Sequence, residues 1–118
     1  MNTLVAQYLE AWNTTEATAR KAAITRVFTD TATYTDPLMA VTGHQGIDAA
    51  IAAAQAQFPG WTFRLTGPVD AHHDQVRFTW ELGPADAPAV VIGFDVAIID
   101  NGRIANVYGF LDKVPATV

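Results

Sequence analysis

Asp95 is the ionisable residue with the most apolar surroundings in this chain. It lies in the run VVIGFDVAII, in which every other residue is apolar or glycine. On a strand its same-face neighbours would be Gly93 and Ala97, whose small size leaves room above the strand. An apolar environment favours the neutral carboxyl and raises its pKa, which makes Asp95 a candidate functional residue. The structural alternative is a carboxyl that bonds to backbone or arginine, or that faces solvent.

Asp36 and Tyr8 are the other candidate catalytic residues. Asp36 stands before proline in ATYTDP, and Tyr8 belongs to the apolar stripe of the first segment, QYLEAWN. Both residues also have a common structural explanation. Asp-Pro steps form turns, and a buried tyrosine usually packs in the core with its hydroxyl hydrogen-bonded.

The aromatic residues indicate, first of all, a hydrophobic core. Some of them could also line an apolar cavity if a sheet curves over helices. The candidate ligand-binding residues are Trp12, Phe63, Phe78, Trp80, Tyr108 and Phe110.

Several other kinds of chemistry lack the residues they need. The chain contains no cysteine and no serine, which excludes a thiol nucleophile, a disulfide scaffold and a Ser-His-Asp triad. Neither an HExxH nor a GxGxxG pattern is present. The histidines, His44, His72 and His73, fall in segments expected to be loops. We therefore expect no metal site and no cofactor.

Charge and hydropathy restrict the partners. The formal net charge of -5, from 12 acidic and 7 basic residues, argues against nucleic acid and against an anionic membrane surface. The first residues lack the basic region of a signal peptide, and the apolar run 87–99 is too short to span a bilayer. The sequence predicts a soluble, cytoplasmic protein.

Hydrophobic periodicity predicts the elements that position these residues. Helical spacing of apolar residues indicates helices before Asn13, over 16–28 and, after the Gly-flanked segment 43–46, over 47–58. A short strand over 32–35 ends at Asp36-Pro37, and the stretch after it is expected to be a loop. From Trp61 the period changes to two, which predicts strands near 61–65, 76–82, 89–99 and 103–111. The last two are joined by Asp100-Asn101-Gly102, a strong signal for a tight hairpin turn.

This order of elements defines an α+β fold in a single domain, 1–118. Helices gathered before antiparallel strands suggest a curved antiparallel sheet that packs on three N-terminal helices and encloses a pocket. The long strands are rich in Val, Ile, Phe and Trp. They carry more apolar surface than three short helices can cover, so we also expect a homodimer that pairs through the sheet.

The element order and four motifs resemble the nuclear transport factor 2-like superfamily, in particular its SnoaL-like and ketosteroid isomerase-like branch. The motifs are QYLEAWN, FTDTATYTDP, GHQGIDAAI and GFDVAIIDNGRIANVYGF. The resemblance covers nearly the whole chain and implies a cone-shaped fold of the cystatin-like roll type. Because this fold serves many functions, the resemblance does not decide the activity.

Ketosteroid isomerases offer the sharpest comparison. The resemblance implies that Asp36 is the base and that Asp95 and Tyr8 hydrogen-bond the enolate oxygen. Such an enzyme would move a proton on a small apolar carbonyl compound without a cofactor. A SnoaL-like polyketide cyclase would use the same enolate for an aldol-type ring closure, and a non-catalytic ligand-binding or dimerisation module would keep only the fold. The sequence leaves these alternatives open.

Overall fold

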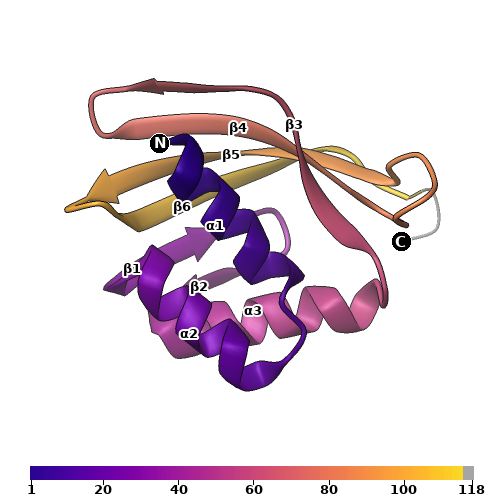
Figure 1. Cartoon of the computed structure of the whole chain (residues 1–118), viewed down its shortest axis with the longest axis horizontal. Helices are drawn as coiled ribbons and strands as arrows, with labels where there is room; N and C mark the ends of the chain where they lie inside the picture. The colour runs from indigo at the N-terminus through magenta and orange to yellow at the C-terminus, as the bar shows by residue number, and fades with distance from the viewer. Residues whose placement is uncertain (116–118) are drawn as a thin grey trace.

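Three helices and six strands make up the part of the chain that the computed structural model describes, residues 1–115. The helices are α1 (Asn2–Asn13), α2 (Ala17–Val27) and α3 (Gly43–Gln57). The strands are β1 (Phe28–Thr35), β2 (Ala40–Thr42), β3 (Thr62–His72), β4 (Gln75–Gly83), β5 (Val91–Asp100) and β6 (Arg103–Lys113). They form one sheet in the order β2-β1-β6-β5-β4-β3 (Figure 1).

The helices begin and end where local sequence signals place them. The Glu16 side chain accepts hydrogen bonds from the backbone N–H groups of Thr18 and Ala19, which caps α2. The third helix ends immediately before Phe58, and Pro59-Gly60 follows. All three helices therefore lie close to their expected bounds.

A partly buried polar cluster fixes the helices against one another. Arg20 on α2 donates from Nε to Asp48 Oδ1 on α3 at 2.7 Å and from Nη1 to Gln55 Oε1 at 3.2 Å. Gln55 in turn donates to the carbonyl oxygens of Trp12 and Thr14. Because these bonds join the end of α1 to α2 and α3, they hold α1 in position beside the sheet.

The predicted hairpins are present, but the sheet is mixed rather than purely antiparallel. Asn101 and Gly102 form the β5–β6 turn with φ angles of 51° and 78°, as the Asp-Asn-Gly signal predicts. By contrast, β1 pairs in parallel with β6, with Tyr34 opposite Val107. Periodicity is a property of each segment alone, so it does not reveal the direction in which two distant strands pair.

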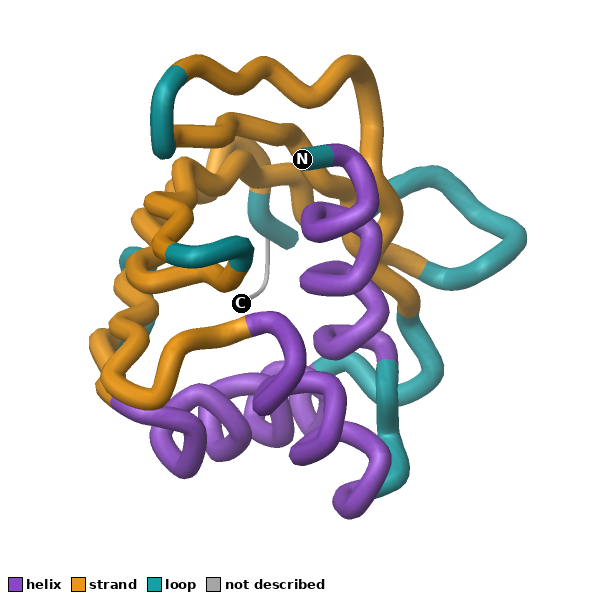
Figure 2. The backbone as a smooth tube through the Cα atoms, turned by 60° about the vertical axis from the view of Figure 1, so that its left-hand side comes forward, coloured by secondary structure: helices purple, strands orange, loops and turns teal. Residues whose placement is uncertain are grey.

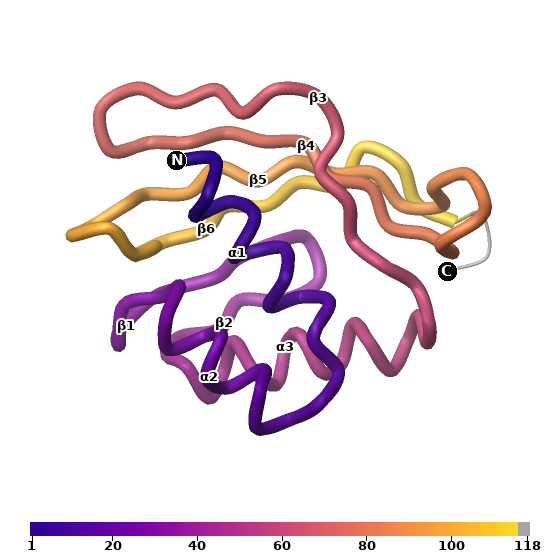
Figure 3. The backbone as a smooth tube through the Cα atoms, in the orientation of Figure 1, coloured from indigo at the N-terminus to yellow at the C-terminus, as the bar shows by residue number. Residues whose placement is uncertain are grey.

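Two stretches differ from the sequence expectation. The expected loop after Asp36 contains the short strand β2, whose Ala40 pairs with Thr35, and β1 begins at Phe28 instead of near residue 32. The third strand continues to His72, past a register irregularity between Thr66 and Asp70. Figure 3 shows β3 rising from the end of α3 and then following β4.

The sheet curves around the helices, and Figure 2 shows all three helices on its concave side. Fully buried side chains between the two layers include Phe28, Ile47, Ile51 and Val107. These residues form one continuous hydrophobic core. None of the helices in residues 1–115 combines the length and the apolar character that crossing a bilayer requires.

Candidate active site

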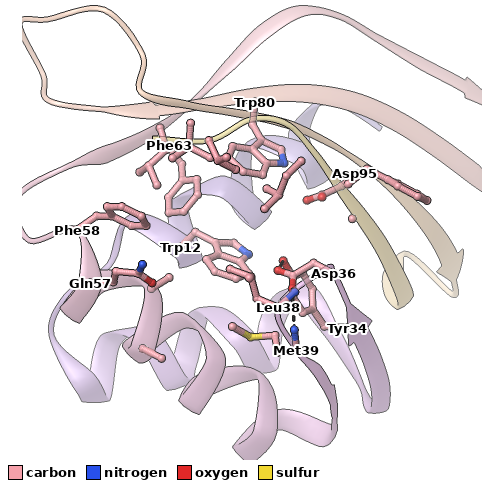
Figure 4. Close-up of a pocket in the computed structure, with 18 of the residues that line it drawn as sticks. Trp12, Tyr34, Asp36, Leu38, Met39, Gln57, Phe58, Phe63, Trp80 and Asp95 are labelled. Carbon is pink, nitrogen blue, oxygen red and sulfur yellow. Dashed lines mark hydrogen bonds between the residues drawn. The ribbon is translucent and has the colours of Figure 1, made fainter. Parts of the chain in front are cut away.

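A cavity of about 480 Å³ lies between the concave face of the sheet and helices α1 and α3. Its walls are mostly aromatic and aliphatic, with Trp12, Phe58, Phe63 and Trp80 among the labelled side chains in Figure 4. The side chains of Tyr8, Tyr34, Asp36, Gln57 and Asp95 supply its hydroxyl, amide and carboxyl groups. Within residues 1–115, no lysine, arginine or histidine lines it. The cavity therefore suits an uncharged, largely apolar molecule.

Asp95 faces this cavity from β5 and is only 3% exposed. Odd-numbered residues of β5 point to the concave side, which places Asp95 beside Gly93 and Ala97 as their spacing predicted. The Tyr8 hydroxyl on α1 donates to Asp95 Oδ2 at 2.7 Å. Asp95 Oδ1 has no hydrogen-bond partner within residues 1–115. Asp95 Oδ2 is thus held by the protein, while Oδ1 can form a hydrogen bond with a ligand.

Burial raises the pKa of Asp95 from its ordinary value of 3.8 to about 6. The hydrogen bond from Tyr8 and the nearby Trp80 N–H lower the pKa of Asp95, and the negative charge of Asp36 raises it. The upward direction agrees with the sequence expectation. The carboxyl is half protonated near pH 6 and mostly ionised at pH 7 in the unliganded protein.

Asp36 lines the cavity and also holds the turn between β1 and β2. Its Oδ1 accepts the backbone N–H groups of Leu38 and Met39 at 2.8 and 3.0 Å. Its Oδ2 accepts the Tyr34 hydroxyl at 2.6 Å. The turn interpretation and the site interpretation of Asp36 are therefore compatible, because the turn orients the carboxylate toward the cavity.

Tyr34 is a site residue that sequence reasoning missed. It precedes Asp36 by two residues, and burial together with the charges of Asp95 and Asp36 holds its pKa above the ordinary tyrosine value. It therefore stays a neutral donor to Asp36. The available signal was the spacing of two, which puts both side chains on one face of an extended segment.

Gly109 on β6 separates the two carboxyl groups. It pairs with Asp95 across the β5–β6 ladder. A Cβ atom placed at Gly109 would lie 2.8 Å from Asp95 Oδ1 and 3.3 Å from Asp36 Cβ. The two acidic side chains therefore approach the same small space, and glycine keeps that space open.

Four of the six aromatic residues expected to bind a ligand border the cavity, and two do not. Trp12, Phe63 and Trp80 line the cavity. Phe110 borders it, but its ring is 52% exposed on the convex face of the sheet and stacks on Phe94, with the ring centroids 5.1 Å apart. Phe78 and Tyr108 are not among the lining residues. The Phe78 ring is buried against Tyr8 at 5.4 Å. Tyr108 lies between the buried residues Val107 and Gly109, so the alternation of β6 exposes it on the opposite face.

Leu38, Met39, Gln57 and Phe58 also line the cavity without having been predicted. They come from the turn before β2 and from the C-terminal end of α3. Nothing in their local sequence distinguishes them from ordinary turn or helix residues. Within residues 1–115, no three His, Asp or Glu side chains gather as possible metal ligands.

Comparison with known proteins identifies the family. The sequence profile of the SnoaL-like domain matches residues 5–107, and the chain belongs to this family within the nuclear transport factor 2-like superfamily. A search of curated proteins found no match. A candidate isomerase of the SnoaL-like family from Agrobacterium tumefaciens shares 41% identity at a TM-score of 0.88, covering 93% of this chain and 95% of that one.

Two more distant solved structures share the fold. A candidate ketosteroid isomerase from Kribbella flavida is 16% identical at a TM-score of 0.71, covering 95% of this chain and 77% of that one. A candidate polyketide cyclase from Sinorhizobium meliloti is 17% identical at a TM-score of 0.72, covering 91% of this chain and 93% of that one. At these identities the likeness concerns the fold alone.

The buried Asp95 carboxyl makes a testable contribution to stability. Because its pKa is raised on folding, ionisation costs stability, and the penalty grows as pH rises from about 4 to about 6. A tenfold change in an equilibrium corresponds to about 1.4 kcal/mol, so the full penalty is about 3 kcal/mol. The free energy of unfolding of Asp95→Asn, relative to that of the unsubstituted protein, should therefore increase by up to about 3 kcal/mol between pH 4 and pH 7, as measured by urea unfolding.

The exposed residue Asp86 provides the control, since Asp86→Asn should leave the pH dependence of stability unchanged. A difference between Asp95→Asn and the unsubstituted protein that stays constant from pH 4 to pH 7 would contradict the raised pKa.

Proposed function

We propose that this protein is a cofactor-independent acid–base enzyme that removes a proton alpha to the carbonyl group of a small, neutral, apolar compound. The observation that carries the proposal is the approach of two carboxyl groups, Asp36 and Asp95, to one space beside Gly109 in an apolar cavity. One of them is anchored by three donors, and the other has a raised pKa. Such divergent environments suit the separate roles of base and hydrogen-bond donor.

In the proposed mechanism, Asp36 removes the alpha proton as the carbonyl oxygen takes up negative charge. Protonated Asp95 donates a hydrogen bond from Oδ1 to that oxygen, which lowers the energy of the enolate. In a β,γ-unsaturated ketone the enolate is conjugated with the C=C bond, so Asp36 can return the proton to the gamma carbon, which moves the C=C bond next to the carbonyl group and completes an isomerisation. Because Asp95 must be protonated, kcat/KM should fall as pH rises above about 6.

The lining also restricts the substrate. Two acidic side chains and no basic ones border the cavity within residues 1–115, so a substrate carboxylate or phosphate would be repelled without a compensating partner. Burial of hydrocarbon surface against the apolar walls is energetically favourable. Neutral ketones with a hydrocarbon body are the preferred substrate class.

A ring closure of the aldol type is the second candidate function. It requires the same enolate and an additional carbonyl carbon within the same cavity. The observation that favours it is the size of the cavity, because about 480 Å³ accommodates a substrate long enough to fold back on itself. The two candidates share the first step and differ in the group that the enolate attacks.

Deuterium incorporation tests the shared first step without knowledge of the natural product. Neutral two-ring ketones in D₂O should exchange their alpha protons faster with the protein present than without it, as followed by ¹H NMR. If these ketones bind saturably but exchange their alpha protons no faster with the protein than in buffer alone, a non-catalytic binding module is favoured.

We also propose that the protein is a homodimer that pairs through the convex face of its sheet. No helix among the described residues covers this face (Figure 2). The face carries the half-buried or exposed residues Ile92, Phe94, Val96, Ile98, Tyr108 and Phe110. Phe94→Glu should convert a dimer into a monomer in light scattering, and a monomeric unsubstituted protein at micromolar concentration would refute the proposal. The cytoplasmic location stays a prediction from the sequence.

A further inference from the structure

Three buried side-chain polar atoms in the described residues lack hydrogen-bond partners, and all three belong to residues that line the cavity. They are Trp12 Nε1, Trp80 Nε1 and Asp95 Oδ1. Buried polar atoms are almost always paired in folded proteins. Their concentration at one cavity indicates a position where a polar atom of a ligand binds.

The Tyr8 hydroxyl already takes part in a hydrogen bond within the protein. It donates its single hydrogen to Asp95 Oδ2 at 2.7 Å, and the residue is 1% exposed. The ring is held edge-on against Phe28 and Phe78, with centroids at 5.8 and 5.4 Å. A phenol that donates to Asp95 cannot donate the same hydrogen to a substrate. Tyr8 therefore orients the Asp95 carboxyl and leaves Oδ1 toward the cavity.

Trp80 is positioned to supply the missing donor. It lies on β4 opposite Gly93 of β5, two residues from Asp95. A Cβ atom at Gly93 would lie 2.5 Å from Trp80 Cζ2, so the absence of a side chain there lets the indole rest on β5. Figure 4 shows the indole nitrogen on the side of the ring that faces Asp95. Trp80 is only 8% exposed, and its N–H lies near the carboxyl without forming a regular hydrogen bond.

We propose that the substrate carbonyl oxygen is held between Asp95 Oδ1–H and Trp80 Nε1–H, with Tyr8 as a positioning residue. This inference rests on the proposed function and replaces the tyrosine donor that the family resemblance implied. When Asp36 takes the alpha proton, the C–H electrons form the new C=C bond and the carbonyl π electrons move to the oxygen. Two fixed donors stabilise that charge, and neither needs to transfer its proton.

Replacing Trp80 with phenylalanine tests the donor, because it removes the N–H and keeps an aromatic ring. Loss of one oxyanion donor typically costs on the order of 10²-fold in kcat, and we expect a loss of this size in deuterium exchange with little change in KM. Trp61→Phe is the matched control, since Trp61 does not line the cavity. Unchanged kcat in Trp80→Phe would overturn the proposal.

A binding measurement separates this inference from the proposed function. 2-Naphthol imitates an enolate, since it places an acidic hydroxyl on a flat two-ring body. Trp80→Phe should weaken its binding by about tenfold, the value of one neutral hydrogen bond, while Trp61→Phe should not. If Asp36→Asn leaves exchange unchanged, the proposed function fails, but the naphthol comparison still decides whether Trp80 donates. Equal naphthol affinity in Trp80→Phe and the unsubstituted protein contradicts the donor role.

NMR of the unsubstituted protein keeps the test valid even if Trp80→Phe does not fold. The three indole N–H resonances can be assigned by elimination with Trp12→Phe and Trp61→Phe. Naphthol should move the Trp80 resonance downfield, as a new hydrogen bond does. A Trp80 resonance that stays in place while naphthol binds would overturn the proposal.

Tyr8→Phe distinguishes a positioning residue from a direct donor. Because the Tyr8 hydrogen bond lowers the pKa of Asp95, its removal should move the alkaline limb of the kcat/KM profile to higher pH. Below that limb, naphthol binding should be largely retained. Loss of naphthol binding without any movement of the pH profile would assign Tyr8 as the donor and reject the pair proposed for Asp95 and Trp80.

Discussion

Asp36→Asn is expected to lower the rate of alpha-proton exchange by about 10²- to 10⁴-fold, the usual contribution of a general base. The amide keeps the shape of the carboxylate but has no basic lone pair at neutral pH. Its oxygen can still accept the N–H groups of Leu38 and Met39, which hold the turn. The fold should therefore survive, and the loss should appear in kcat.

The exposed residue Asp112 on β6 provides the control for charge alone. Asp112→Asn changes the net charge by the same amount and should keep the exchange rate of the unsubstituted protein. If Asp36→Asn matches Asp112→Asn in the exchange assay while both remain folded by circular dichroism, Asp36 is not the base.

Gly109→Ala is expected to reduce exchange by at least about 10²-fold, because its Cβ would occupy the space that the two carboxyl groups share. That atom would lie 2.8 Å from Asp95 Oδ1, which is closer than a real Cβ contact allows. The Asp95 carboxyl would have to turn away, although Tyr8 holds its other oxygen at 2.7 Å. A misplacement of this kind removes the orientation on which catalysis depends.

The steric cost of Gly109→Ala should also appear in stability, as a loss of about 1–3 kcal/mol from overpacking. Gly46→Ala is the matched control. Its Cβ would crowd Val41 at 3.2 Å, but Gly46 does not line the cavity. The control adds a crowded methyl group on α3 outside the cavity and should therefore keep its activity. Full exchange activity in Gly109→Ala would show that the space between the carboxyl groups is not the reaction site.

The helices and hairpins could be predicted because their signals are local. The stripe of α1 puts Tyr8 and Trp12 on its buried face, and the Asp-Asn-Gly turn joins β5 to β6. The strand β2 was missed because three residues carry too little periodicity to differ from a loop. Such short edge strands depend on a partner, which here is β1.

Part of the site could also be predicted. The raised pKa of Asp95 follows from a carboxyl among apolar neighbours, which is visible in the sequence. The contact between Tyr8 and Asp95 joins residues 87 positions apart, and only the family resemblance suggested it. Tyr108 was expected at the cavity but does not line it, since a choice between strand faces requires the register of the neighbouring strand.

By itself, the sequence determined the α+β order of elements, the apolar neighbours of Asp95 and the absence of thiol and serine chemistry. The tertiary structure decided which groups meet. The parallel pairing of β1 with β6 brings Asp36 to Gly109, and the register of β4 on β5 puts Trp80 beside Asp95. The physical reason is that residue type and periodicity act over a few neighbours, whereas strand register and direction are set by packing between segments far apart in the chain.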